Sequence, residues 1–145
     1  MEVDEPVLIG RLPLEIILEY PDVFLKDAPE PEIKHLSDYI RSTKRLITLE
    51  ECDIHNNSIS RVHCMIFPGE ETKILDLYST NGTILANAGG GIKLEAGRRT
   101  EIQPNTTILL AQGAAIFQYF SFDKQERAGL AFEQDMMNYG TELNI

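Results

Sequence analysis

The sequence predicts an all-β fold in which two sheets form a β-sandwich, followed by a C-terminal helix. Short apolar runs follow one another at near-regular intervals, separated by turn residues, which is typical of a sandwich. An Asn81-Gly82 pair follows one of these runs, and both residues tolerate the positive φ of a tight turn. Side chains from Ala114 to Phe122 alternate between two faces, as in a strand. We therefore expect residues 6–122 to form the sandwich and residues 123–145 a helix and tail.

The first part of the chain contains two predicted strands and an insertion. Pro6–Leu12 is interpreted as the first strand, and Ile16–Leu25 as an edge or bent strand because Pro21 interrupts it. Residues 26–44 form an insertion before the third strand. Pro31 suits a first helical turn there, and three apolar residues follow at helical spacing: Ile33, Leu36 and Ile40. A short helix and a structured loop are both open for this segment.

The later elements follow from apolar runs bounded by turn residues. These predicted strands are Leu46–Leu49, Val62–Phe67, Lys73–Leu77, Ile92–Leu94, Thr106–Ala111 and Ala114–Phe122. Asp123–Asn138 is then predicted to be a helix, because Asp123 suits the N-cap and Glu126 the capping box. One side of this helix is apolar and is expected to pack on the sandwich: Ala128, Phe132 and Met136.

Composition and charge restrict the class of protein. The net charge is -10, but residues 1–30 carry eight acids against two bases, whereas residues 31–120 carry ten against nine. Without clustered Lys and Arg, binding to a nucleic-acid backbone is not expected. No apolar run approaches the length of a membrane span, and Met1–Glu5 is unlike a signal peptide. Two cysteines suit a reducing compartment, so we expect an intracellular protein, in the nucleus or the cytoplasm.

Hydrogen-bond donors gather in the loops beside the two predicted strands Val62–Phe67 and Lys73–Leu77. The donor residues are Ser58, Ser60, Arg61, Ser79, Thr80 and Asn81. Loops of this composition, held by a rigid β scaffold, are suited to binding an anion.

These residues resemble the forkhead-associated (FHA) domain, a β-sandwich that binds phosphothreonine peptides. The resemblance rests on the segment Ser60-Arg61-Val62-His63, on the turn Asn81-Gly82-Thr83 and on the run Asp76–Thr80 before it. Upstream, Cys52-Asp53-Ile54 is similar to the Cys-Asp-Ile segment of the family. The resemblance is specific over Leu46–Asn87 and follows the family pattern over Ile92–Phe120.

The resemblance implies a non-enzymatic module, without a cofactor, that docks a phosphorylated segment of a partner protein. It implies that Ser60 and Thr80 donate hydrogen bonds to phosphate, that Arg61 assists, and that Asn81 holds the peptide main chain. His63 is implied to tie the binding loops together, and two more residues shape the turn: Gly82 and Thr83. Such modules usually sit inside longer chains, so we expect the sequence to be part of a larger protein or complex.

The family also uses a Gly-Arg pair to grip phosphate, just before the Cys-Asp-Ile segment. Counting back from Cys52 places this pair on Ile47 and Thr48, which have neither role. Gly10-Arg11 lies about forty positions earlier and is interpreted as part of the first strand instead. Two other basic residues, Arg45 and Arg41, are therefore the candidates for the cation. The alternative is a scaffold that binds a protein partner independently of phosphate.

A zinc site or a Cys/His nucleophile is a competing interpretation. The residues concerned are Cys52, His55, His63 and Cys64. His63 and Cys64 are adjacent on a predicted strand and therefore point to opposite faces, which separates the ligands. We accordingly expect no metal site and no catalytic site.

Overall fold

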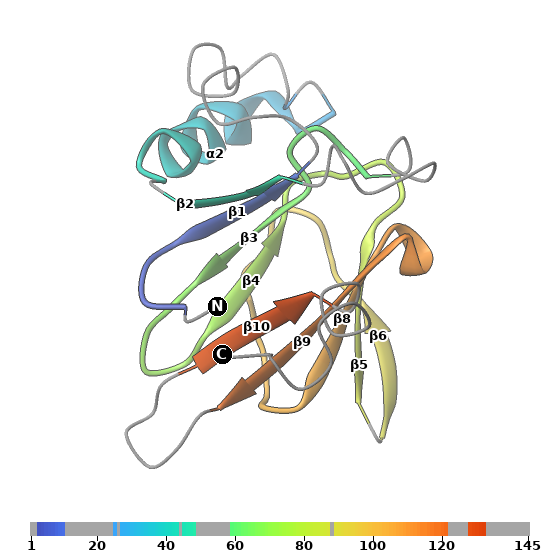
Figure 1. Cartoon of the computed structure of the whole chain (residues 1–145). Helices are drawn as coiled ribbons and strands as arrows, with labels where there is room; N and C mark the ends of the chain where they lie inside the picture. The colour runs from blue at the N-terminus through green and yellow to red at the C-terminus, as the bar shows by residue number, and fades with distance from the viewer. Residues whose placement is uncertain are drawn as a thin grey trace.

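Two five-stranded sheets stack face to face, and a helix covers the outer side of one of them (Figure 1). This computed structural model describes residues 3–10, 25, 27–43, 45–48, 59–87, 89–121 and 128–132. Both sheets are mostly antiparallel, as expected for the predicted sandwich. No helix among the described residues is long and apolar enough to cross a bilayer.

The first sheet has the strand order β2-β1-β3-β4-β7. Its strands are β1 (Val7–Gly10), β2 (Arg45–Thr48), β3 (Cys64–Phe67), β4 (Lys73–Asp76) and β7 (Thr100–Glu101). β1 and β2 are parallel, with Val7 opposite Arg45 and Gly10 opposite Thr48. Parallel neighbours require a crossover, so the chain returns to the same end of the sheet between β1 and β2.

The second sheet has the order β10-β9-β8-β5-β6 and is antiparallel throughout. Its strands are β5 (Thr83–Asn87), β6 (Gly90–Lys93), β8 (Thr106–Leu110), β9 (Ala115–Ser121) and β10 (Ala128–Phe132). A short 3-10 turn, η3 (Ala111–Gly113), joins β8 to β9. No strand is predicted from the sequence for β5, whose short apolar run directly follows the Asn81-Gly82 turn.

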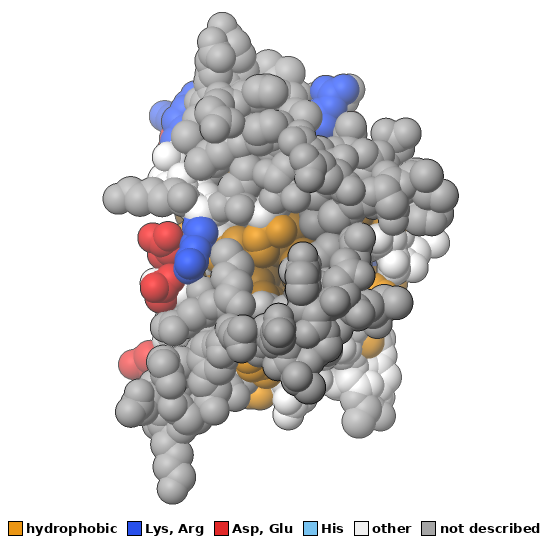
Figure 2. All heavy atoms as spheres, viewed as in Figure 1, with side chains coloured by type: hydrophobic (Ala, Val, Ile, Leu, Met, Phe, Trp, Pro, Cys, Tyr) orange, Lys and Arg blue, Asp and Glu red, His pale blue; other side chains and the backbone are white. Residues whose placement is uncertain are grey.

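Alternate side chains of the first sheet enter two separate cores. On β1, Val7 and Ile9 face the second sheet, where Ile108 and Phe117 meet them. Leu8 faces the other way, into a cluster with Leu36 and others. A sheet covered on both faces requires continuous apolar runs, which explains why β1 and β3 are buried along their full length. Hydrophobic side chains are visible in the middle of the face shown in Figure 2, with charged ones at its margins.

Helix α2 (Glu30–Arg41) covers the outer face of the first sheet. Of the two conformations that the sequence left open here, the structure adopts the helix. Pro31 lies in the first turn, where its missing N–H costs no hydrogen bond. Leu36 and Ile40 are buried on one side of the helix. The domain is therefore not purely β, because the crossover adds a helical layer to the sandwich.

The predicted C-terminal helix is wrong for residues 128–132, which form strand β10. These residues pair antiparallel with β9, from Ala128 opposite Ser121 to Phe132 opposite Phe117. Ala128, Leu130 and Phe132 fit a two-residue alternation as well as a helical stripe, and β9 offered a free edge to pair with. Tertiary pairing thus overrode the local helical pattern. The rest of the predicted helix, and the predicted strand at 16–24, lie outside the described residues.

Candidate functional site

The site is built around His63, which is completely buried. Its ring lies between the loop before β3, which contains Ser60, and the loop after β4, which contains Gly82. The backbone N–H of Ser60 donates to Nδ1 at 3.1 Å, so Nε2 carries the proton and donates to the carbonyl of Gly82 at 2.9 Å. Burial lowers the pKa of His63 below its usual 6.5, against the opposing effects of the Gly82 carbonyl and Asp76. A neutral ring therefore joins two loops that are 19 residues apart.

Asp76 holds the loop after β4 in place by accepting hydrogen bonds from Ser79 and Thr83. One carboxylate oxygen accepts the hydroxyls of Ser79 and Thr83 at 2.6 and 2.7 Å, and the other accepts the Ser79 N–H at 3.1 Å. The Ser79 hydroxyl oxygen in turn accepts the Gly82 N–H at 3.0 Å. Asp76 is buried and fully engaged, so it shapes the loop rather than facing a ligand. Asp76 belongs to the run before the Asn81-Gly82-Thr83 turn that carries the resemblance, but it was not among the predicted site residues.

The two loops meet directly at their rim. The Thr80 N–H donates to the Ser60 hydroxyl oxygen at 2.9 Å. Thr80, Asn81 and Arg61 are exposed, and Ser60 is half-buried. The structure therefore brings all four of the predicted loop residues to one surface. We call residues 60–62 and 78–82 together the loop cluster.

Gly10 approaches the loop cluster from the end of β1. A Cβ at this position would lie 2.3 Å from the carbonyl oxygen of Arg61, so only glycine fits. The N–H of His63 also donates to the carbonyl of Ile9 at 2.9 Å. Gly10-Arg11 is not part of the predicted phosphate site because of its distance along the chain, but in the fold Gly10 lies against the backbone of Arg61 in that site. Arg11 itself lies outside the described residues.

Arg45 and Arg41, the two arginines predicted to bind phosphate, lie away from the loop cluster. Arg45 is opposite Val7, at the other end of β1 from Gly10, and forms ion pairs with Asp4 at 2.7 Å and Glu5 at 3.9 Å. Arg41 lies in the last turn of α2, 3.8 Å from Asp38. The structure thus brings neither guanidinium into a described contact with the loop cluster.

Helix α2 is tied to the loop cluster by one hydrogen bond. The Tyr78 hydroxyl donates to the carboxylate of Glu32, across 46 residues of sequence. Burial, followed by this contact with Glu32, raises the pKa of Tyr78 to about 12. Tyr78 has a φ of 58°, and its ring lies so close to Gly97 that no Cβ fits there. The crossover helix therefore contacts the residue that opens the predicted binding turn.

Of the four residues in the zinc interpretation, only His63 and Cys64 belong to the described part of the chain. Cys52 and His55 lie outside the described residues. Both ring nitrogens of His63 are engaged in hydrogen bonds, and burial raises the pKa of the Cys64 thiol. A protonated thiol and an occupied ring are poor metal ligands. In the described part of the chain, no three His, Cys, Asp or Glu side chains are placed to hold a metal ion.

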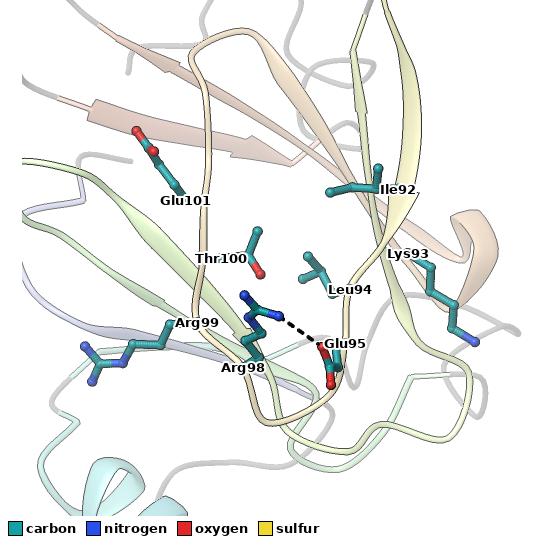
Figure 3. Close-up of a pocket in the computed structure, with 8 residues that line it drawn as sticks. All are labelled: Ile92, Lys93, Leu94, Glu95, Arg98, Arg99, Thr100 and Glu101. Carbon is teal, nitrogen blue, oxygen red and sulfur yellow. Dashed lines mark hydrogen bonds and ion pairs between the residues drawn. The ribbon is translucent and has the colours of Figure 1, made fainter.

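An open groove of about 300 Å³ lies at the side of the sandwich, where β6 and the 95–101 segment adjoin (Figure 3). Its lining includes Leu94, Arg98 and Thr100, and Arg98 forms an ion pair with Glu95 at 3.4 Å. None of the predicted site residues lines this groove.

Comparison with known families gives one match. The family model of the FHA domain matches residues 41–111. The match runs from the last residue of α2 to the start of η3 and includes the two loops joined by His63. It leaves out β1 and Gly10, which the crossover separates from the rest. A comparison with curated proteins finds no match.

Proposed function

We propose that this chain docks a phosphothreonine-containing segment of a partner protein, because the family model that matches residues 41–111 is that of the FHA domain, a family that generally binds phosphopeptides. The partner binds as an extended peptide across the loop cluster, and no covalent chemistry takes place. Affinity from one short segment is modest, so a second contact or a second phosphorylated site strengthens the assembly.

The observation that carries this proposal is the junction between Ser60 and Thr80. The bond from the Thr80 N–H to the Ser60 oxygen leaves the Ser60 proton free to donate outward, beside the Thr80 hydroxyl. These two hydroxyls are assigned to phosphate oxygens, and the Asn81 amide to the peptide main chain. Arg61, exposed next to Ser60, assists with charge.

We assign the phosphate-gripping cation to Arg11, ahead of Arg45 and Arg41. Gly10 lies against the Arg61 backbone, and Arg11 is joined to it by a peptide bond. Arg45 is neutralised by two carboxylates at the far end of β1. A guanidinium suits this role because it donates two parallel hydrogen bonds to a phosphate.

The test is a titration of the whole chain with a phosphothreonine peptide library and its unphosphorylated counterpart, followed by fluorescence anisotropy. Binding that depends on phosphate supports the proposal, whereas equal binding to both libraries favours a scaffold that ignores phosphate. Ser60→Ala with Asn81→Ala should abolish phosphopeptide binding.

The same titration separates the three arginines. Arg11→Ala should weaken phosphopeptide binding by about 10- to 100-fold, the loss of one hydrogen-bonded charge contact. Arg45→Ala and Arg41→Ala serve as matched controls, and each should change the affinity less than two- or threefold. A large loss at Arg45 or Arg41 with none at Arg11 would reverse the assignment.

A further inference from the structure

Lys93 is a basic side chain that lies against the loop cluster but belongs to neither of its loops. A Cβ built at Gly82 would lie 2.9 Å from Cε of Lys93 and 3.6 Å from its Nζ. The side chain thus lies over the residue that follows Asn81. Gly82, with a φ of 81°, has no side chain to push the lysine away.

The position of Lys93 is set by the backbone of the second sheet. Lys93 is the last residue of β6 and is opposite Ile84 on β5. The next residue, Leu94, donates its N–H to the carbonyl of Thr83 at 2.9 Å. Lys93 also lines the groove, but Figure 3 shows its side chain extending away from Arg98 and Thr100. The strand therefore places the end of the Lys93 side chain beside Gly82 of the loop cluster.

Nothing in the described structure neutralises this ammonium. Lys93 is exposed, and among the described residues it has no acidic partner within ion-pair distance. The nearest acid in sequence, Glu95, is paired with Arg98. Asp76, which lies beneath the loops, already accepts three hydrogen bonds. Among the described residues of this strongly acidic chain, Lys93 is thus a positive charge without an acidic partner, and it lies beside the predicted binding turn.

We propose that Lys93 selects an anionic side chain in the bound peptide, close to the phosphothreonine. This inference rests on the proposed function. One Cα–Cα step of about 3.8 Å separates Gly82 from Asn81, so the ammonium reaches a peptide residue within about three positions of the one held at Asn81. The selected group is a carboxylate or a second phosphate, since both accept hydrogen bonds from an ammonium.

The test compares phosphothreonine peptides that differ at one position, scanned over three residues on either side. Each position carries Gln, Glu or phosphoserine, and binding is measured by anisotropy with the native chain, with Lys93→Gln and with Lys34→Gln. Lys34 is an exposed residue of α2, so its variant changes the net charge equally without touching the loop cluster.

At one position the native chain should bind the Glu peptide about two- to fivefold more tightly than the Gln peptide, as for an exposed ion pair. Lys93→Gln should remove this preference, and Lys34→Gln should keep it. A larger preference for phosphoserine, lost in the same variant, identifies a doubly phosphorylated segment.

Two results would overturn the inference while leaving the proposed function intact. One is a native chain that binds Gln, Glu and phosphoserine peptides equally. The other is a Lys93→Gln variant that loses the same factor for all three, which would place Lys93 on the phosphothreonine itself. Binding of the native chain that does not depend on the phosphothreonine phosphate would overturn both proposals together.

Discussion

At the scale of single residues, His63 has the largest structural role in the site. Its ring accepts from Ser60 on one side and donates to Gly82 on the other, without access to water. A protonated ring would lose the bond from Ser60, since both nitrogens would then be donors. The neutral form is therefore the one that the folded chain requires, and the lowered pKa of His63 expresses this requirement.

Acidification should destabilise the chain through His63. The pKa of His63 is lowered on folding, so the unfolded chain binds this proton more tightly and stability from the residue is lost as pH falls below 6.5. We expect the thermal midpoint to fall more steeply with acidification in the native chain than in His63→Asn. His35→Gln serves as the comparison variant, because it removes a histidine whose side chain is exposed. Parallel slopes for the native chain and His63→Asn would contradict this prediction.

At the scale of elements, helix α2 adds a layer to the outer face of the first sheet. It buries Leu36 and Ile40 against the first sheet, and Arg99 stacks between it and β3, with its guanidinium carbon 4.6 Å from the Tyr39 ring and 3.9 Å from the Phe67 ring. Through Glu32 it also holds Tyr78, whose left-handed backbone conformation is unfavourable for a side chain of this size. The helix is thus attached both to the sheet and to the loop cluster.

Tyr78 and Glu32 should show a measurable coupling. Tyr78→Phe and Glu32→Ala, each alone, should destabilise the fold by about 1 kcal/mol, the net value of a typical hydrogen bond. The double variant should lose less stability than the sum of the two single variants, because either single change already removes the hydrogen bond. Denaturant unfolding of the four proteins measures this. Tyr39→Phe with Glu32→Ala is the matched control and should be additive, since the Tyr39 hydroxyl bonds to His35 instead.

At the scale of the whole molecule, the pairing of β1 with β3 brings distant parts of the chain together at the predicted binding site. β1 runs antiparallel to β3 with Ile9 opposite Cys64, so Gly10 meets the loop cluster although about fifty residues separate them. The parallel pair adds a helical layer without breaking the sandwich. A long connection between β1 and β2 is tolerated because loop-closure entropy rises only slowly with loop length.

Gly10→Ala tests this convergence. The added methyl would meet the Arg61 backbone at 2.3 Å, so β1 or the loop must shift. We expect a loss of about 1–3 kcal/mol in the free energy of unfolding, as for other overpacked sites, with weaker phosphopeptide binding. Gly69→Ala is the control, because a Cβ there would meet no atom closer than 3.5 Å. Equal stability of the two variants would show that the approach of Gly10 is not required.

Much of the site was predictable because it is encoded locally. Ser60, Arg61 and His63 are three near neighbours, and the turn from Asp76 to Thr83 forms within eight residues. Short-range hydrogen bonds from Asp76 and Ser79 hold that turn, so its residues alone indicate its shape. The strands β3 and β4 were predicted for the same reason, since each is one apolar run between turn residues.

The features that only the tertiary structure decided depend on contacts between residues far apart in the sequence. The sequence determined, by itself, the sandwich class, the two predicted binding loops and the similarity to the FHA domain, whose family model matches residues 41–111. It did not determine that β1 pairs in parallel with β2, that β10 adds to β9 as a strand, or that Gly10 and Lys93 border the loop cluster. Local patterns report on neighbours in the chain, whereas these contacts form only once two sheets have paired and brought distant backbones within van der Waals distance.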